Sequence, residues 1–488
     1  MFGCTLERSY EIQTALRRAG ANWQGDKTLA EHVKIAILGA GLSGLSTSYH
    51  LGHPSDAVIF EAKSHHGGHV HSETVDGFTW DDGPHISFTS NEYIKTLFSD
   101  LVDGEYIDLY IKAVNWYEGN WIDHPAQTSL WQIPEPLRKK CLDSFLDYTQ
   151  REHEPPKNYE QWLHQAMGPV FADTFPAAYT RKYWTCEPRN MDVDWIGMRI
   201  LRPEKDDVVN SYHRALPETM YYVNSRSSRY PRNGGFWAYC HQLAAGAHIR
   251  YNKQLVAANF SKRWLRFSDG TEITYDRLVS SAHLQHLIPM LEDATDELRT
   301  AGETLTSSIF YRLDFHVNHP PKREELWVYV YDEDKLSVRI SVTEKFAESN
   351  APAGKTGIQV EVYGSKWKAL PPQDEVLRRV TAELIEFGLV ENETFIERKD
   401  VRLVPTGQIV YDLNRKGAIR EVNSWLDKQG IIRVGRYSEW KYLMSDTCVL
   451  GGRRAAQQLM GKDDDTDWRG VAITADDVPE DAASSPRS

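Results

Sequence analysis

The chain has 488 residues, of which 41% are hydrophobic, and a formal net charge of -13. This length predicts two or three domains with a large buried core. The acidic balance, without a basic stripe, argues against a nucleic-acid partner. No run of eighteen apolar residues occurs and the N-terminus lacks the pattern of a secretory signal, so we expect a cytoplasmic protein with no membrane partner. The five cysteines lack metal-ligand spacing, which predicts no metal site and fits a reducing compartment.

The first recognisable unit begins after residues 1–32, which we interpret as an N-terminal extension with a surface helix over residues 10–19. Residues 34–38 are a short apolar run typical of a buried parallel strand, and they end in a GxGxxG turn. In this motif Gly39 permits the tight turn, Gly41 lets the backbone approach a pyrophosphate, and Gly44 lets the following helix pack closely on the sheet.

An acidic residue completes the dinucleotide-binding pattern. A predicted helix over 45–51 and a predicted strand over 57–60 follow the glycine turn, and the strand ends on Glu61. A carboxylate about 20 residues beyond the turn is placed to accept both ribose hydroxyls of an adenosine. The combination of strand, turn, helix, strand and acid predicts a dinucleotide site rather than an unrelated glycine turn.

A second glycine turn narrows the choice of dinucleotide. The segment from Glu61 through Ala62 to Gly67 and Gly68 resembles the acid-then-Gly-Gly continuation of the large FAD-dependent family that includes amine oxidases, protoporphyrinogen oxidase and UDP-galactopyranose mutase. An NAD dehydrogenase does not need this second turn. The resemblance therefore implies FAD as the cofactor.

A loop that follows a small hairpin is the predicted flavin contact. Residues 69–82 alternate like a hairpin, and residues 83–90 follow as a loop that begins Gly-Pro-His. Pro84 fixes the backbone, so that His85 can meet the isoalloxazine face. The alternative is that His85 is a buried histidine hydrogen-bonded to backbone.

The remaining chain combines helical and strand patterns. We expect helices over 91–100 and 376–387, a hairpin at 110–121, and one antiparallel sheet built from residues 309–317, 326–331, 336–342 and 357–362. Residues 431–434 predict the last central strand. Asp446 is the predicted N-cap of a closing helix that ends at residue 460, whose N-terminus would stabilise negative charge on the flavin.

These patterns predict an α/β fold, with a Rossmann-like FAD-binding domain, an inserted helical domain and an antiparallel β-sheet substrate domain. The FAD-binding domain comprises residues 33–100, 229–300 and 430–462, the largely helical insertion residues 101–228, and the substrate domain residues 301–429. Residues 463–488 have the acidic, Ser- and Pro-rich composition of a disordered tail.

Further motifs resemble one branch of this family, UDP-galactopyranose mutase, over residues 33–460. The resemblance is carried by the Gly-Pro-His-Ile loop, the aromatic pair Tyr179 and Trp184, the segment from Trp195 to Arg199, and a C-terminal signature from Gly435-Arg436 to Tyr442. In addition, Tyr329 stands ten residues before Arg339, which is the spacing of a nucleotide-contacting tyrosine and a phosphate-binding arginine in that family.

The resemblance implies a reaction in which N5 of the reduced flavin attacks the anomeric carbon of a sugar nucleotide, and the sugar ring recloses with a different size without net redox change. Arginine forks would stabilise the leaving diphosphate. The implied catalytic residues are His85, Arg199, Arg339 and Tyr442. The implied substrate contacts are Gln127, Tyr179, Trp184, Arg199, Tyr329, Arg339, Gln408, Tyr411 and Tyr442. The implied cofactor contacts are Gly39, Gly41, Gly44, Glu61, Ala62, Gly67, Gly68, His85, Val256, Gly435, Arg436 and Asp446.

The resemblance also implies partners. The substrate would be a nucleotide sugar, and keeping FAD in its active reduced form would require a reductant such as NAD(P)H or a reductase. A homo-oligomer is left open.

Two positions depart from the family pattern. Gln408 stands 28 residues before Arg436, where the family has a second phosphate-binding tyrosine, and Tyr411 nearby lies on another face of an extended stretch. Ala126 replaces an aromatic residue before Gln127. Both changes affect the substrate pocket. The alternative function is therefore an FAD-dependent oxidase or dehydrogenase of the amine oxidase or protoporphyrinogen oxidase type, and a third is a non-catalytic FAD-holding protein.

Overall fold

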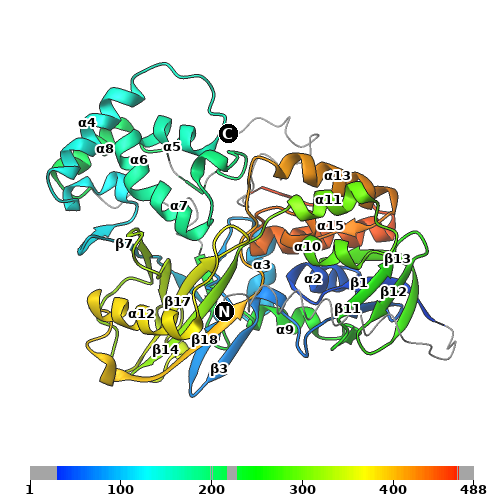
Figure 1. Ribbon diagram of the computed structural model, residues 1–488. Helices are drawn as coiled ribbons and strands as arrows, with labels where there is room; N and C mark the ends of the chain where they lie inside the picture. Colours follow the sequence, from blue (N-terminus) through cyan, green and yellow to red (C-terminus); the bar gives the residue numbers. More distant parts are fainter. Residues whose placement is uncertain (1–29, 198, 201, 217–227, 470, 472–488) are drawn as a thin grey trace.

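The computed structural model describes residues 30–197, 199–200, 202–216, 228–469 and 471 (Figure 1). The helix that we expected over residues 10–19 lies outside these residues, and so does most of the predicted tail. Figure 1 shows the helical segment at the upper left, a large sheet below it, and the dinucleotide-binding part at the right.

The first large sheet forms the centre of the dinucleotide-binding part. Its strand order is β10-β2-β1-β13-β12-β11, and β19 pairs with β13. The strands are β1 (Glu31–Leu38), β2 (Ala57–Phe60), β10 (Ile249–Arg250), β11 (Leu255–Asn259), β12 (Trp264–Phe267), β13 (Glu272–Ser280) and β19 (Ile432–Arg433). Pairing is parallel from β10 to β13 and on to β19, and antiparallel through β12 and β11.

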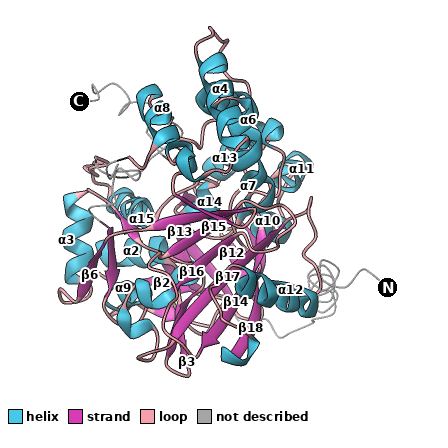
Figure 2. Cartoon of the chain, turned by 90° about the vertical axis from the view of Figure 1, so that its left-hand side faces the viewer, coloured by secondary structure: helices cyan, strands magenta, loops and turns pink. Residues whose placement is uncertain are grey.

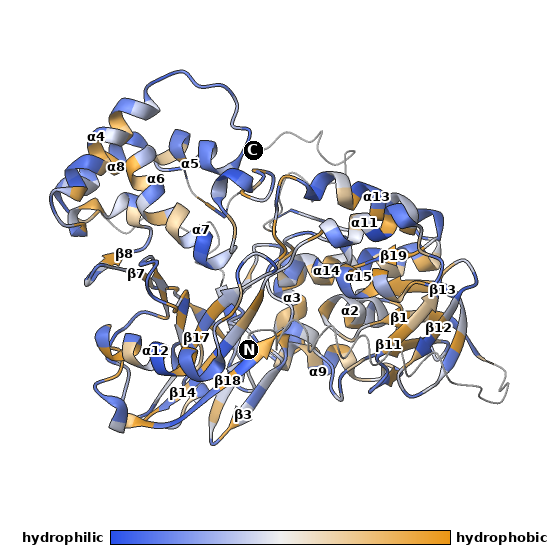
Figure 3. Ribbon diagram, in the orientation of Figure 1, coloured by the Kyte–Doolittle hydropathy of each residue, from blue (hydrophilic) through white to orange (hydrophobic). Residues whose placement is uncertain are grey.

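Alternate residues of the parallel strands face two different cores, as the period of two in a strand requires. Ile37, Ile59 and Val279 belong to the cluster that includes Leu45 and Val449. Those last two residues lie on α2 (Leu42–His50) and α15 (Ser445–Met460), which pack against each other. The residues next to these in sequence, such as Leu38, Phe60 and Leu278, belong to the cluster on the opposite face of the sheet. Strand β1 is accordingly coloured as hydrophobic over much of its length (Figure 3).

The second large sheet has the order β18-β14-β17-β16-β15-β7-β8. Its strands are β7 (Ala113–Tyr117), β8 (Asn120–Asp123), β14 (Ile309–Val317), β15 (Trp327–Val330), β16 (Arg339–Val342), β17 (Thr356–Gly364) and β18 (Ile396–Val404). Helix α12 (Gln373–Glu386) covers one face, where Val376, Val380 and Leu384 join the sheet's core (Figure 2).

The four strands that we expected to form one antiparallel sheet, β14, β15, β16 and β17, do pair antiparallel, and the sheet adds a parallel pairing with β7. Strand β7 runs parallel to β15, while the other neighbouring pairs of this sheet are antiparallel. The β7–β8 hairpin lies in the stretch that we assigned to the helical insertion, but Val114 and Trp116 bury their side chains in the core of the second sheet. The sheet thereby gains two strands from a distant part of the chain.

A helical segment lies over one end of the second sheet. It contains α4 (Leu137–Thr149), α5 (Tyr159–Met167), α6 (Pro169–Ala172), a π-helical stretch (Asp173–Ala177), α7 (Ala178–Tyr183) and α8 (Lys205–His213). The π-helical stretch joins α6 to α7 and contains Pro176, which cannot donate a backbone hydrogen bond to the helix.

The smaller elements connect these three parts. The helices are α3 (Glu92–Asp100), α9 (Ala238–Ala244), α10 (Leu284–Leu287), α11 (Asp296–Thr304), α13 (Arg415–Lys428) and α14 (Arg436–Glu439). The short strands are β3 (Ser72–Val75), β4 (Phe78–Asp81), β5 (Ser87–Phe88), β6 (Tyr106–Leu109) and β9 (Ser228–Pro231).

Two expectations at the C-terminal end are corrected. The N-cap of α15 is Met444, whose amide donates to Thr447 Oγ1 at 2.8 Å, so Asp446 lies inside the first turn. The predicted disordered tail begins with ordered residues, because the side-chain amide of Asn91 donates to the carbonyls of Asp467 and Arg469 at 2.9 and 2.8 Å. No helix among the described residues combines the length and apolar character needed to cross a bilayer.

Candidate functional site

The first glycine turn leads directly from β1 into α2. A Cβ atom added to Gly44 would lie 2.0 Å from the carbonyl oxygen of Gly39, so the helix approaches the turn too closely for any side chain. Gly39 has a φ of +96°, which only glycine adopts easily. Helix α2 begins after Gly41 without a side-chain cap, which leaves its first amides to bind an anion.

Glu61 joins the two glycine turns. It is 6% exposed, and its two carboxylate oxygens accept the amides of Ala40 at 2.7 Å and Lys63 at 2.8 Å. The amide of Gly67 in turn donates to the Ala40 carbonyl at 2.8 Å. Each carboxylate oxygen has a second lone pair, so Glu61 can still accept two ribose hydroxyls.

The remaining predicted cofactor contacts surround this pair of turns. Ala62 is exposed beside Glu61. Val256 is half-buried at the start of β11, three residues after Lys253, whose amide donates to the Glu61 carbonyl at 2.7 Å. A Cβ on Gly435 would lie 2.6 Å from Ser43 Oγ, so the C-terminal signature packs against the first turn of α2.

A fit to a bound dinucleotide is indicated by Gly41 and Gly68. A Cβ on Gly41 would meet no described atom nearer than the Gly68 Cα at 3.9 Å, and the φ of Gly41 is an ordinary -78°. The folded chain therefore has room for a side chain at Gly41, and the need for glycine there comes from a bound group. The paired turns, the uncapped helix and Glu61 suit the pyrophosphate and ribose of FAD.

Asp446 offers a second indication of a bound group. Its carboxyl is 1% exposed, Oδ1 accepts the Thr447 amide at 2.7 Å, and Oδ2 has no hydrogen-bond partner among the described residues. Burial raises the pKa of Asp446 to about 6. An unsatisfied buried carboxyl oxygen on the first turn of α15 suits a cofactor contact.

His85 and His69 both lie near the signature arginine. Burial, and then the charge of Arg436, lowers the pKa of His85 to about 3, with a further contribution from Arg339. The pKa of His69 is likewise lowered to about 3, first by burial, then by Lys63 and Arg436. Both imidazoles are therefore neutral at physiological pH.

Two guanidinium groups lie close to the ring of Tyr442. Arg199 is 4.5 Å and Arg436 is 4.9 Å from the centre of its ring. Arg199 donates to the carbonyls of Trp195 at 3.0 Å and Tyr442 at 2.5 Å, while Arg436 donates to the Leu443 carbonyl at 2.9 and 2.6 Å. The structure thus brings Arg199 to Arg436 and Tyr442, which are more than 200 positions away in the sequence.

Gln408 contacts this cluster, whereas Tyr411 supports it from inside the protein. Gln408 Oε1 accepts from Arg436 at 3.2 Å. Tyr411 is fully buried, and its hydroxyl accepts the Tyr442 amide at 2.8 Å. In this arrangement the Tyr411 hydroxyl is engaged with the backbone of Tyr442, and its contact with substrate stays a prediction.

Trp184, another implied substrate contact, lies in an aromatic cluster next to Tyr442, and its contact with substrate stays a prediction. Trp184 is 4% exposed, and its ring packs 4.9 Å from Trp195 and 5.7 Å from Tyr442. Gln127 lies elsewhere, at a narrow space inside the helical segment that Cys141 and Phe145 also line.

Arg339 belongs to a polar row that crosses the second sheet. Strand register places neighbouring members of the row opposite each other, in the order Asn115, Tyr329, Arg339, Glu361, Arg312 and Arg402. Arg339 donates from Nε and Nη2 to the two oxygens of Glu361 at 2.6 and 2.9 Å. Burial alone would lower the pKa of Arg339, but Glu361 holds it well above its ordinary value.

Tyrosine rings connect the polar row to the Tyr442 cluster. Tyr179 lies 5.6 Å from Tyr329 in an edge-to-face contact and 5.5 Å from Tyr183. Burial raises the pKa of Tyr183, with contributions from Tyr442, whereas Arg339 opposes the increase. Tyr183 therefore lies close both to Tyr442 and to Arg339 of the polar row.

Three residues of this site were not predicted, namely Glu361, Tyr183 and His69. Glu361 had a visible signal, because residues 358–362 alternate apolar and polar side chains along a strand. His69 directly follows the second glycine turn, and Tyr183 stands one helical turn after Tyr179 on α7.

The parallel sheet, the paired glycine turns and Glu61 define a dinucleotide-binding protein of the Rossmann-like α/β class. A profile of the flavin-containing amine oxidoreductase family matches residues 42–460. The chain belongs to this family, and FAD is its cofactor.

Relatives and solved structures extend the comparison. The chain is 21% identical over 388 residues to a 1-hydroxycarotenoid 3,4-desaturase from Flavobacterium sp., covering 69% of this chain and 78% of that protein. It is 35% identical over 69 residues to the mitochondrial protoporphyrinogen oxidase of Nicotiana tabacum, which is 14% of each chain. A crystal structure of reduced UDP-galactopyranose mutase matches with a TM-score of 0.83 and 23% identity, over 88% of this chain and 96% of that one. A structure described as a putative protoporphyrinogen oxidase from Exiguobacterium matches with a TM-score of 0.67 and 15% identity, over 89% and 99%.

Proposed function

We propose that the protein is a flavin-dependent mutase that interconverts the pyranose and furanose forms of a nucleotide sugar. The observation that carries this proposal is the placement of Arg199 and Arg436 on the ring of Tyr442, close to the tyrosines that neighbour Arg339. A gathering of guanidinium groups would repel a cationic amine and attract a diphosphate. The likeness to the mutase structure supports the same substrate class.

In this proposal the reduced flavin, when bound, supplies the nucleophile for the anomeric carbon. Residues of the chain stabilise the negative charge on the diphosphate of the leaving nucleotide. Arg436 provides cationic charge: burial opposes that charge, but Tyr437 and Tyr442 raise the pKa of Arg436. Arg339 can offer its Nη1 group while Glu361 retains the other two nitrogens. Tyr442 would hydrogen-bond a phosphate oxygen, and neutral His85 would border the flavin without adding charge.

Nucleotide binding tests the proposal. We expect UDP, as the probe, to change the fluorescence of the reduced flavin at fixed salt, and Arg199→Lys to weaken that binding at least tenfold because lysine lacks a planar fork. Arg202→Lys is the matched control, since Arg202 is exposed on the same segment and donates to the Gln165 carbonyl. Normal FAD content with unchanged UDP binding in Arg199→Lys would contradict the proposal.

A second candidate is an FAD-dependent oxidase or dehydrogenase. This function is favoured by the likeness to the desaturase. It is also favoured by two contacts that leave fewer arginine N–H groups to bind a diphosphate. Glu361 accepts hydrogen bonds from two of the three guanidinium nitrogens of Arg339. Gln408, which stands where the mutase family has a tyrosine, accepts a hydrogen bond from Arg436. An oxidase would consume oxygen or another acceptor in proportion to product, whereas a mutase would need its reductant only to keep the flavin reduced.

A further inference from the structure

The loop between β15 and β16, residues 331–338, is anchored to helix α12. Glu383 accepts the amides of Leu336 and Ser337 at 2.7 and 2.9 Å and the Ser337 hydroxyl at 2.6 Å. At the end of the loop, the Val338 amide donates to the Glu361 carbonyl at 2.9 Å. The position of the loop is therefore coupled to β17, whose Glu361 binds Arg339.

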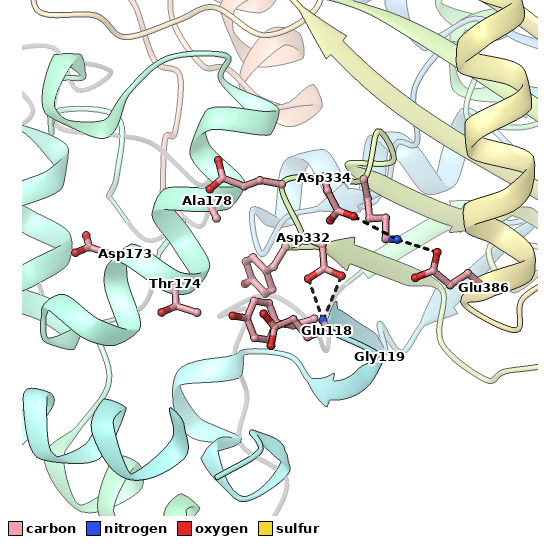
Figure 4. Close-up of a pocket in the computed structure, with 12 residues that line it drawn as sticks. Glu118, Gly119, Asp173, Thr174, Ala178, Asp332, Asp334 and Glu386 are labelled. Carbon is pink, nitrogen blue, oxygen red and sulfur yellow. Dashed lines mark hydrogen bonds and ion pairs between the residues drawn. The ribbon is translucent and has the colours of Figure 1, made fainter. Parts of the chain in front are cut away.

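A pocket of about 590 Å³ separates part of this loop from the helical segment. Figure 4 shows Asp173, Thr174 and Ala178 on the helical side and Asp332 and Asp334 on the loop side. The same view shows the Glu118 amide donating to the Asp332 carboxylate. Beside the pocket, the ring of Tyr331 packs edge-to-face on Phe175 and Tyr179 at 5.3 and 5.8 Å, and polar contacts add to this packing.

Lys182 of α7 makes one such contact. Its side chain is buried, and Nζ donates to three carbonyls, that of Val330 at the end of β15 at 2.8 Å and those of Asp332 and Ser337 in the loop at 2.7 and 2.8 Å. A lysine ammonium has three N–H donors, so the three carbonyls satisfy it completely. The contact requires both ends of the loop to stay folded around the ammonium.

Arg181, the preceding residue of α7, holds the outside of the same loop. It donates to both carboxylate oxygens of Glu333 at 2.6 and 2.7 Å. The side chains are 30% and 50% exposed, so water weakens this ion pair. Arg181 is therefore a natural control for the buried lysine beside it.

The two parts that Lys182 connects carry opposite sides of the candidate site. Helix α7 carries Tyr179 and Tyr183, and the hairpin closed by the loop carries Tyr329 and Arg339. Tyr179 and Tyr329 are 5.6 Å apart, and Tyr329 directly precedes Val330, whose carbonyl binds Lys182. A shift of the loop away from α7 would separate these side chains.

We propose that Lys182 is a positioning residue, which latches α7 to the β15–β16 loop and so sets the distance between the tyrosines of α7 and the Tyr329–Arg339 pair. The inference rests on the proposed function, because it assigns these side chains to nucleotide binding. Lys182 acts through the loop and touches neither substrate nor cofactor.

The free-energy cost of burying the Lys182 ammonium explains why the loop is held in one position against α7. Burial lowers the pKa of Lys182 to about 7, with Glu383 and Asp332 opposing the decrease. A buried ammonium that lost its carbonyl partners would be strongly unfavourable. An apolar residue at this position would fill the space but would tolerate many positions of the loop.

The test compares Lys182→Met with Arg181→Ala in the FAD-loaded protein. Hydrogen exchange of the amides of residues 331–338 reports on the latch, and UDP binding to the reduced protein reports on the site. In Lys182→Met we expect loop exchange at least tenfold faster, UDP affinity at least tenfold lower, and normal FAD content. Saturating UDP should slow loop exchange again, because coupling between two sites is reciprocal. Arg181→Ala should stay within about twofold of wild type in both readouts, as expected for an exposed ion pair.

The outcomes separate the latch from the function. Wild-type loop exchange in Lys182→Met would overturn the latch. Faster exchange with unchanged UDP affinity would overturn its role in positioning. If wild-type protein does not bind UDP, the proposed function fails, and the positioning role fails with it. Should Lys182→Met not fold, Lys182→Gln, whose amide group keeps two N–H donors, gives the same two readouts.

Discussion

Glu361 holds the guanidinium of Arg339 in a two-point ion pair, with Nε and Nη2 at 2.6 and 2.9 Å from its carboxylate oxygens. The two side chains are 15% and 2% exposed. Arg339 is therefore a structural partner of Glu361 as well as a candidate phosphate ligand, and a single substitution removes both roles at once.

The first prediction separates these roles. Arg339→Ala should lower the free energy of unfolding by about 3 kcal/mol or more, because it leaves the Glu361 carboxylate buried without its cation. The double variant Arg339→Met, Glu361→Gln should recover most of that loss but should still bind UDP weakly. Urea unfolding and flavin fluorescence measure the two effects. Wild-type stability in Arg339→Ala would refute the structural role.

The second prediction contrasts two glycines of one turn. Gly44→Ala should destabilise the protein by about 3 kcal/mol or more or prevent folding, because its Cβ would lie 2.0 Å from the Gly39 oxygen. Gly41→Ala should fold normally, because its nearest neighbour would be 3.9 Å away, but it should bind FAD at least tenfold more weakly. Thermal melting of the FAD-free protein and FAD titration test this contrast. Unchanged FAD affinity in Gly41→Ala would show that the pyrophosphate does not approach this residue.

The third prediction concerns Glu61. Glu61→Gln keeps the size of the side chain but replaces one acceptor oxygen by an amide, which cannot accept from both Ala40 and Lys63. The amide nitrogen also cannot accept a ribose hydroxyl, and losing one hydrogen bond between the ribose and a charged acceptor costs about 1.5–3 kcal/mol of binding free energy, so FAD affinity should fall roughly 10- to 100-fold. Reconstitution of the FAD-free protein, followed by flavin fluorescence, measures this change. Lys63→Ala, which removes an exposed side chain, should bind FAD as wild type does.

The fourth prediction is a pH dependence. Because burial raises the pKa of Asp446 to about 6, the folded FAD-free protein holds a proton that the unfolded chain has already lost above about pH 4. The stability contributed by this carboxyl is present below about pH 4 and is lost as the pH rises through about 6. The Asp446→Asn variant has no carboxyl at this position, so its stability should not show this loss. The stability difference between Asp446→Asn and wild type should therefore grow between pH 4 and 7, by up to about 3 kcal/mol. A constant difference in urea unfolding across this range would contradict the prediction.

Local sequence patterns predicted the elements that local interactions determine. The glycine turn, the following helix and the strand that ends before Glu61 were predicted with bounds close to those of β1, α2 and β2. The cap of α15 was predicted two residues too late, because Thr447 stabilises Met444 as the cap, and Asp446 takes part in the first turn instead.

Long-range pairing explains most of what could not be predicted. Strand β18 has charged side chains at most positions of its exposed face, so it lacks the apolar alternation of a strand. Nothing local indicates that β7 pairs with β15, or that Tyr411 turns into the core to hold Tyr442. The resemblance to the mutase family identified the arginines of the site, whereas the ion pair of Arg339 with Glu361 became clear only from the pairing of β16 with β17.

The most direct test of the account is the stoichiometry of turnover. The FAD-loaded protein, kept anaerobic and reduced with much less dithionite than substrate, is incubated with UDP-linked and other nucleotide-linked pyranoses, and products are resolved by chromatography and mass. We predict an isomer of unchanged mass, formed many times per reducing equivalent. Product formed in proportion to reductant or oxygen, with a change in mass, or no conversion of any nucleotide sugar, would contradict the assignment as a mutase.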